Sequence, residues 1–274
     1  MKQPFERGIY LLPNLMTTAA LFAGFYAVIA GMQGNFEQGA IAIFIAMVFD
    51  GLDGRIARMT NSSSAFGAEY DSLADMVSFG LAPALLVYQW ALHDFGKLGW
   101  LAAFIYTAGA ALRLARFNTQ VGVADKRYFQ GLPSPAAAAL LAGLVWMVEN
   151  DQMMHDWLPV VTLGLTVFAG LMMVSNVRFH SFKELNLKNK VSFVTLILGV
   201  MVLVFISIKP AMILFIAIFL YAFSGPIITL VTLRKTREMR RQQREQSESV
   251  ATDPSADTMP RSEAEDKTET EPKK

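Results

Sequence analysis

The chain has 274 residues, of which 53% are hydrophobic and 17% are charged, and it contains no cysteine. This apolar composition excludes an ordinary soluble domain, and we predict an all-α integral membrane protein. The absence of cysteine excludes disulfides, thiolate metal sites and a cysteine nucleophile, so any metal must be held by oxygen atoms or by the three histidines.

Taken in chain order, eight apolar segments are long enough to cross a bilayer as helices when tilt is allowed for. They are Leu15–Gly31, Gln38–Arg58, Ala68–Leu92, Leu98–Phe117, Pro135–Val148, Trp157–Ser175, Val191–Ile208 and Pro210–Leu233. Polar residues precede the first segment, which is too long for the apolar part of a signal peptide, so no cleavable leader is expected.

The distribution of lysine and arginine favours this eight-span model with both termini in the cytoplasm. Up to Arg244, only Lys97 and Lys209 fall in predicted outer loops, and all other basic residues fall in predicted inner segments. Cytoplasmic loops of membrane proteins carry this excess of positive charge. The expected location is therefore the cell (inner) membrane, with a polar active-site cavity that faces the cytoplasm.

The C-terminal region differs in composition from the rest of the chain. Residues 1–233 form the predicted membrane-embedded domain, and residues 234–274 form a basic and then acidic tail. From about Gln242 the tail has almost no large apolar side chains, so it cannot bury enough surface to fold, and we predict that it is disordered.

Four aspartates form two pairs, at the end of the second span and the start of the third. Asp50 and Asp53 are three residues apart, and Asp71 and Asp75 are four apart, so on helices each pair shares one face. The polar segment 60–64 favours a turn, which would let the pairs face each other across a helical hairpin. Crowded carboxylates repel one another unless a cation lies among them. We therefore predict a site for hard divalent cations that clamp a phosphate group.

Acids in a membrane chain can also serve other purposes. An EF-hand is excluded because its alternating acidic ligands and final glutamate are missing. A membrane prenyltransferase needs a second aspartate-rich motif, whereas the later spans offer only Asp151 and Asp156, both on the predicted outer side. A cation-coupled transporter predicts acids near the midplane and an inverted repeat, which the sequence does not display. A structural interpretation has the acids neutralise Arg55, Arg58, Arg113 and Arg116.

The spacing Asp50-x2-Asp53-Gly54-x2-Ala57-Arg58-x8-Gly67-x3-Asp71-x3-Asp75 is similar, at every fixed position, to the signature of the CDP-alcohol phosphotransferases. These are integral membrane enzymes of phospholipid synthesis. Further segments resemble the phosphatidylserine synthase branch of the family: Asp71–Pro83, Leu112–Asn118, Gly131–Pro135 and Ser175–Phe179. After Asp75, Met76 stands where phosphatidylglycerophosphate synthases tend to have lysine.

The resemblance implies transfer of the phosphatidyl group of CDP-diacylglycerol to the hydroxyl of L-serine, which gives phosphatidylserine and CMP. It implies two divalent cations, Mg2+ or Mn2+, with Asp50, Asp53 and Asp71 as ligands and Asp75 as both ligand and general base. The CDP-diacylglycerol-binding residues that it implies are Gly54, Arg58, Ser64, Gly67, Asn14 and Thr17. It also implies a homodimer whose partners are membrane lipids, with no nucleic acid.

The binding site for the alcohol is less clearly marked in the sequence. Arg113, Arg116 and Asn118 end the fourth span on the same side as the aspartates and are candidates to bind the serine carboxylate. Anchoring of the span at the cytoplasmic surface explains the arginines equally well. Within the family, another alcohol such as choline, inositol phosphate or glycerol phosphate is the alternative substrate.

Overall fold

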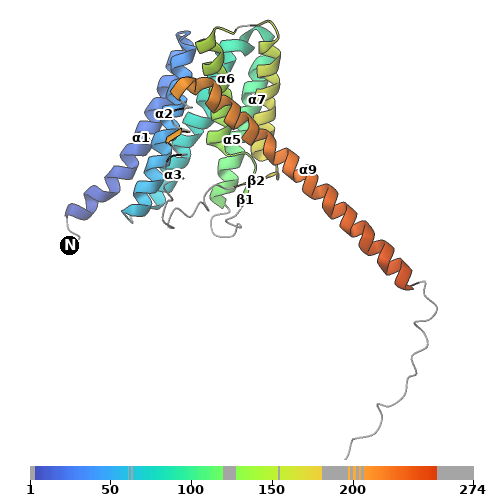
Figure 1. The fold of residues 1–274 in the computed structure, drawn as a ribbon. Coiled ribbons are helices and arrows are strands. Elements are labelled where there is room, and N and C mark those ends of the chain that lie inside the picture. Colours follow the sequence, from blue (N-terminus) through green and yellow to red (C-terminus); the bar gives the residue numbers. More distant parts are fainter. Residues whose placement is uncertain are drawn as a thin grey trace, which may run out of the picture. The chain divides into compact units, whose positions relative to one another are not determined.

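A computed structural model describes residues 4–60, 62, 64–119, 128–153, 155–180, 197, 200–201, 204 and 207–251. It divides into a compact unit, Met1–Thr229, and a second unit, Leu230–Lys274, and each is described by itself. The main helices (Figure 1) are α1 (Pro4–Met32), α2 (Phe36–Met59), α3 (Ala65–Asp75), α4 (Ala82–Val87), α5 (Lys97–Thr119), α6 (Ser134–Asp151), α7 (Leu158–Val174) and α9 (Pro210–Ala251).

The helical membrane class predicted from composition agrees with the structure. Four described segments are long and apolar enough to cross a membrane: Leu12–Met32, Ala65–Phe95, Lys97–Thr119 and Pro210–Thr229. The expected spans at 38–58 and 135–148 form α2 and α6, which are not among these four, and α7 is apolar but shorter. Most of the expected seventh span, 191–208, lies outside the described residues. The count of eight spans therefore stays a prediction.

The first two helices form a tight hairpin that supports the aspartate-bearing end of α2. The chain reverses between them at Gly34, whose φ of 76° is a conformation that glycine adopts without steric cost. Small side chains then allow the helices to approach closely, and Ala27 and Ala40 are completely buried. Figure 1 shows α1 and α2 side by side along their lengths.

The third expected span is a broken helix. After α3 ends at Asp75, a π-helical stretch, Met76–Leu81, leads into α4, and a second π-helical stretch, Tyr88–Leu92, follows. Phe79, Leu86 and Val87 are fully buried, so the part beyond the first π-helical stretch is anchored in the core. A 3-10 turn at His93–Phe95 closes the segment.

A short antiparallel ladder was not predicted by the all-α interpretation. β1 (Tyr128–Gln130) pairs with β2 (Arg178–His180), and Phe129 lies opposite Phe179. Strands of three residues are too short to produce a readable alternation of apolar and polar residues. Phe179 is 1% exposed and packs at a ring-centroid distance of 5.7 Å against Tyr221 of α9, so the ladder contributes to the core.

The second unit differs from the expected disordered tail. α9 runs without interruption to Ala251, through the basic run that begins at Arg234 and past Gln242. Arginine, glutamine and glutamate are good helix formers, and pairs of opposite charge four residues apart add support, so low hydrophobicity does not prevent a helix here. The acidic remainder of the predicted tail, 252–274, lies outside the described residues.

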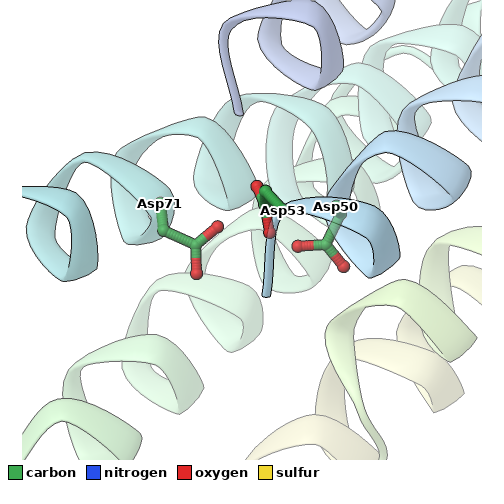
Figure 2. A group of neighbouring side chains, drawn as sticks. All are labelled: Asp50, Asp53 and Asp71. Atoms are coloured by element: carbon green, nitrogen blue, oxygen red, sulfur yellow. The ribbon is translucent and has the colours of Figure 1, made fainter. Parts of the chain in front are cut away.

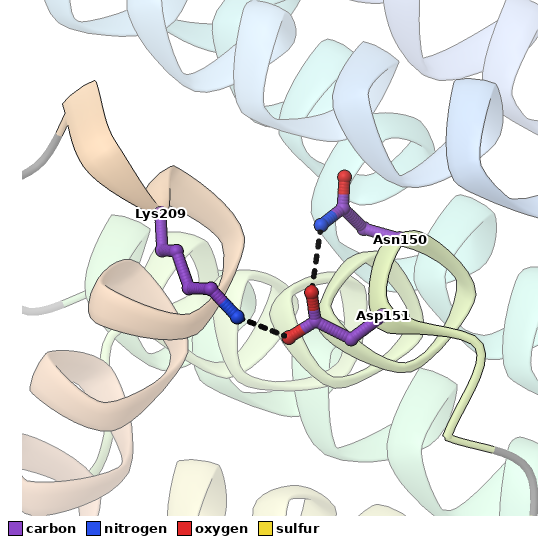
Figure 3. Close-up of polar contacts among 3 residues, drawn as sticks. All are labelled: Asn150, Asp151 and Lys209. Atoms are coloured by element: carbon purple, nitrogen blue, oxygen red, sulfur yellow. Dashed lines mark hydrogen bonds and ion pairs between the residues drawn. The ribbon is translucent and has the colours of Figure 1, made fainter.

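A polar cluster joins α6 to α9 at the C-terminal end of α6. Lys209 Nζ lies 3.5 Å from Asp151 Oδ2, and Asn150 Nδ2 donates to Asp151 Oδ1 at 3.1 Å (Figure 3). Nearby, Trp90 Nε1 donates to Glu149 Oε1 at 2.6 Å. Lys209 and Asp151 were both predicted on the outer side, and the structure has them in contact.

Glycines let α5 and α7 cross with their backbones in contact. A Cβ at Gly170 would lie 2.8 Å from the Cα of Tyr106 and 2.9 Å from the carbonyl oxygen of Ile105. A Cβ at Gly109 would lie 2.4 Å from the carbonyl oxygen of Gly170. Neither position has room for a side chain unless the helices move apart.

Gly170→Ala is therefore expected to lower the free energy of unfolding by about 1–3 kcal/mol, the usual cost of overpacking a core. Gly164→Ala in the same helix is the matched control, because no described atom lies within 4 Å of the added Cβ. Thermal unfolding of both variants in detergent micelles measures the difference. Equal melting temperatures for the two would contradict the close crossing.

Candidate functional site

The structure brings three of the four aspartates into one cluster. Asp50 and Asp53 lie near the C-terminal end of α2, and Asp71 lies on α3. One carboxylate oxygen from each lies within 4.8 Å of the others, and Figure 2 shows the three side chains turned toward one another. Thr60 ends α2 and Ser64 caps the start of α3, so the chain passes from one helix to the other within the polar segment where the sequence predicted a turn.

Asp75 lies beside this cluster and not within it. Its carboxyl lies close to that of Asp50, and it interacts electrostatically with both Asp50 and Asp71. The prediction placed all four acids around the metals. In the structure, Asp50, Asp53 and Asp71 form the cluster, and Asp75 lies next to Asp50. Asp75 is the last residue of α3, directly before the π-helical stretch.

Among the described residues, the four carboxylates have no ion-paired basic partners that would balance their charge. Asp53 is only 6% exposed, and Asp50, Asp71 and Asp75 are partly buried. In the part of the chain that the structure describes, none of the four forms an ion pair with a lysine, arginine or histidine. Of the arginines named in the structural alternative, only Arg113 interacts electrostatically with one of these acids, Asp75, among the described residues, and it does so without an ion pair.

A divalent cation fits this donor set. Asp50, Asp53 and Asp71 are positioned to bind a metal ion through carboxylate oxygens, the hard ligands that Mg2+ and Mn2+ prefer. Thr17 of α1 donates from Oγ1 to Asp53 Oδ2 at 2.7 Å and lies 3.1 Å from the carbonyl oxygen of Pro13. A hydrogen bond of this kind fixes the orientation of a ligating carboxylate.

A cavity of about 200 Å3 adjoins the metal-binding carboxylates, and Asp53 and Asp71 form part of its wall. It lies among the start of α1, the end of α2 and the start of α3. All six residues predicted to bind CDP-diacylglycerol line it: Asn14, Thr17, Gly54, Arg58, Ser64 and Gly67. A ligand in this cavity would touch the acids and the positively charged Arg58 together.

Local structure explains two of the residues that line this cavity. Ser64 caps α3, and its Oγ accepts a hydrogen bond from the Gly67 N–H at 3.0 Å. A Cβ at Gly67 would lie 3.1 Å from Ser64 Oγ and 3.4 Å from Asn14 Oδ1, so a side chain there would crowd the cap. A separate hollow of about 240 Å3, lined by Gln89, Trp90, Ala91, His93 and Asp94, contains none of the clustered acids.

The three residues predicted to bind the alcohol do not converge. Arg116 Nη1 donates to the carbonyl oxygen of Val174 at 3.0 Å and lies 3.4 Å from Asn176 Oδ1. Asn118 Nδ2 donates to Ser72 Oγ at 3.0 Å. Both side chains therefore tie α5 to neighbouring segments, and their assignment to the serine carboxylate stays a prediction.

Arg113 alone of these three residues lies toward the acids. Its guanidinium interacts electrostatically with Asp75, and its Nη1 donates to Ser134 Oγ at 2.9 Å. Its buried Nε has no hydrogen-bond partner among the described residues. Tyr106 and Tyr221 lie close enough to interact with its charge. Ser134 lies in the segment Gly131–Pro135 that carries part of the family resemblance, whereas nothing in the local spacing of the two tyrosines relates them to the acids.

Comparison with known proteins identifies the family. The family model described as CDP-alcohol phosphatidyltransferase matches residues 10–170, which is more than half of the chain. The chain belongs to the CDP-alcohol phosphatidyltransferase family. The family predicted from the aspartate spacing is thus confirmed, and the prenyltransferase and transporter interpretations are set aside.

Several CDP-alcohol phosphatidyltransferases with curated names are similar to this chain. One from Helicobacter pylori strain J99, named CDP-diacylglycerol–serine O-phosphatidyltransferase, is 35% identical over 77% of this chain and 89% of its own length. Proteins with the same name from Methanocaldococcus jannaschii (35% identical, 57% of this chain, 70% of that protein) and Saccharomyces cerevisiae (38%, 50% and 54%) also match.

Among solved structures, Mycobacterium tuberculosis phosphatidylinositol phosphate synthase with CDP-DAG bound aligns with a TM-score of 0.47 and 21% identity. The alignment covers 62% of this chain and 88% of that one.

Membership in the CDP-alcohol phosphatidyltransferase family makes this chain a membrane enzyme of phospholipid synthesis. The family uses divalent metal ions, and Asp50, Asp53 and Asp71 are the residues positioned to bind one here. These three acids and the adjoining cavity form the candidate active site.

Replacement of Asp71 by asparagine is expected to weaken Mn2+ binding at least about tenfold, since loss even of groups that support metal ligands costs this much. Isothermal titration of Mn2+ into detergent-solubilised protein measures the affinity. Asp151→Asn is the control, because Asp151 is paired with Lys209 and lies outside the cluster. Unchanged Mn2+ affinity in Asp71→Asn would remove this residue from the metal site.

Proposed function

We propose that the protein transfers the phosphatidyl group of CDP-diacylglycerol to the hydroxyl of L-serine, which gives phosphatidylserine and CMP. The observation that carries this proposal is the cavity of about 200 Å3 whose wall includes Asp53, Asp71 and Arg58. It offers metal-binding oxygens and a cation to one ligand, as a pyrophosphate requires. The choice of serine rests on the names of the similar proteins and on the residues after Asp75.

In the proposed complex, the cavity holds the CDP end of the lipid substrate. Arg58 pairs with a phosphate oxygen in a charge-assisted hydrogen bond. Gly54 and Gly67 keep side chains out of the way of the ligand, and Asn14, Thr17 and Ser64 offer polar groups. Two divalent cations, Mg2+ or Mn2+, bound by Asp50, Asp53, Asp71 and Asp75 would neutralise charge on the pyrophosphate and the departing CMP.

Asp75 is the proposed general base. It accepts the proton of the serine hydroxyl while the serine oxygen bonds to the phosphatidyl phosphorus and the bond from that phosphorus to the CMP oxygen breaks. Its contact with Asp50 supports this role, because a base must lie beside the bound phosphate group to reach the attacking alcohol. Positioning of the two reactants supplies much of the expected rate enhancement.

Arg113 is the proposed partner of the serine carboxylate. Its guanidinium lies near Asp75, and its buried Nε donor can form a hydrogen bond to a carboxylate oxygen. A ligand held there would present its hydroxyl toward the base. Choline has no anionic group for Arg113 to bind, whereas glycerol phosphate and inositol phosphate do, so they remain the competing alcohols.

The proposal includes the membrane orientation and the oligomeric state of the enzyme. The membrane-embedded domain spans residues 1–233 of an inner-membrane protein, with both termini and the active site at the cytoplasmic face. The distribution of lysine and arginine supports this orientation. The homodimer is retained from the family resemblance.

The proposal is tested by CMP release from CDP-diacylglycerol with a panel of alcohols: L-serine, choline, glycerol phosphate and inositol phosphate. Purified protein with Mn2+ or Mg2+ should release CMP with serine, and Asp75→Asn should reduce turnover by at least about a hundredfold because the base is lost. Absence of CMP release with every alcohol would refute the enzyme activity. Release with a different alcohol would reassign the acceptor.

Arg113→Met is expected to raise the KM for serine by about 10–100-fold, because a hydrogen bond to a charged group contributes about 1.5–3 kcal/mol. The KM for CDP-diacylglycerol should stay the same, since Arg113 does not line that cavity. Arg55→Met is the control, because Arg55 is exposed and also lies outside the cavity. A lower kcat with an unchanged KM for serine would contradict carboxylate binding and assign Arg113 to Asp75 instead.

A further inference from the structure

The π-helical stretch that follows Asp75 fixes how the acids on α3 are oriented relative to the core. A π-helical turn places one extra residue in the turn, and each residue of a helix rotates the chain by about 100°. Asp71 and Asp75 lie before Met76–Leu81, and the buried anchor residues Leu86 and Val87 lie after it. If this stretch rewound to a regular α-helix, the acids would turn away from Asp50.

Proline explains why the helix departs from the α form at this point. Pro83 lies four residues after Phe79, so in an α-helix the carbonyl of Phe79 would need a hydrogen bond from residue 83. Proline has no N–H, and its ring clashes with that carbonyl. In the interior of a membrane protein, a backbone carbonyl that loses its helical partner must find another within the protein.

Tyr106 of α5 supplies a partner to this carbonyl. Its hydroxyl donates to the Phe79 carbonyl oxygen at 2.9 Å, and the tyrosine side chain is fully buried. A second hydrogen bond links the stretch to α1, where Ser78 Oγ donates to the carbonyl oxygen of Ala20 at 3.0 Å. A Cβ at Gly24 would lie 2.4 Å from Ser78 Oγ, so glycine makes room for this contact. Hydrogen bonds thus link the π-helical stretch to both α1 and α5.

The same helix reaches Asp75 directly. Arg113 lies seven residues after Tyr106, which is close to two helical turns, so both side chains project from one face of α5. Arg113 interacts electrostatically with Asp75 and with Tyr106. One face of α5 therefore contacts both ends of the segment from Asp75 to Phe79.

We propose that Tyr106 is a positioning residue, whose hydroxyl holds the π-helical stretch in the register that sets Asp75 against Asp50. The proposal rests on the proposed function for the role of Asp75 in catalysis, but the positioning itself can be measured without catalysis.

The chain has no cysteine, so the two thiols of Asp50→Cys/Asp75→Cys report on their separation without background. A short bifunctional thiol reagent should crosslink them in detergent-solubilised protein. Adding Tyr106→Phe should lower the crosslinking rate about fivefold, as expected for loss of one hydrogen bond. Adding Thr162→Val should leave the rate unchanged, because among the described residues this buried hydroxyl donates within α7, to the Leu158 carbonyl. Equal crosslinking rates with and without Tyr106→Phe would overturn the proposal.

A second variant keeps the test decisive if Tyr106→Phe destabilises the protein generally. Pro83→Ala restores an N–H four residues after Phe79, so the carbonyl no longer depends on the tyrosine hydroxyl. In the Pro83→Ala background, Tyr106→Phe should change the crosslinking rate by less than about twofold. The two substitutions are expected to be non-additive because both act on the same carbonyl, that of Phe79. A full fivefold effect in both backgrounds would contradict the proposal.

Kinetics distinguishes positioning from a general structural role. In the otherwise natural sequence, Tyr106→Phe should lower kcat for CMP release about fivefold and leave the KM for CDP-diacylglycerol unchanged, because Tyr106 does not line that cavity. A raised KM with an unchanged kcat would overturn the positioning role. If no alcohol supports CMP release in the natural sequence, the proposed function fails, while the crosslinking result still decides the role of Tyr106.

Discussion

The crowding of carboxylates without ion-paired basic partners is the constraint on which the described part of this molecule depends. Like charges within a few ångströms repel strongly where the dielectric constant is low. Asp50, Asp53 and Asp71 nevertheless share one small volume, and no ion pair to them occurs in the described residues. Contacts elsewhere must therefore hold α2 and α3 together. The alanine-lined hairpin of α1 and α2 and the buried segment beyond the π-helical stretch provide those contacts.

The arrangement divides the site into two sides that meet at Asp75. On one side, α1, α2 and α3 enclose the cavity proposed for CDP, and Thr17 links α1 to the acid cluster. On the other side, α5 contributes Arg113, and α6 contributes Ser134 to its hydrogen bonding. Such a division allows two substrates to approach one set of acids from different directions.

The sequence predicted the metal-binding side well, because its residues lie close together along the chain. Helical spacing and a turn-prone loop are enough to relate Asp50 and Asp53 to Asp71, and the family resemblance supplied six more of the residues that line the cavity. The proposed alcohol side is less clearly marked in the sequence. Arg113, Arg116 and Asn118 are close together in sequence. Asn118 follows Arg113 by five residues, however, so on a helix the two side chains project in very different directions.

The other misses have similar physical reasons. Tyr106 and Tyr221 approach Arg113 only through tertiary packing, which a single sequence does not encode locally. The ladder of three-residue strands is too short to leave a periodic pattern. Pro83 is a sequence signal for an irregular helix at this point. A proline in an apolar helix predicts a kink just as well, however, so the π-helical form and the resulting register of the residues on either side were not predictable.

Tyr221 of α9 and Phe179 of the ladder connect the later part of the chain to the site. Both residues lie beyond residue 170, where the match to the family model ends, yet Tyr221 interacts with Arg113 and packs against Phe179. The cavity proposed for the CDP end is thus lined wholly by the matched portion, while part of the proposed acceptor side comes from the chain after it. Grafting the segment after residue 170 between family members with different acceptors would then exchange part of the alcohol site and leave the nucleotide cavity intact.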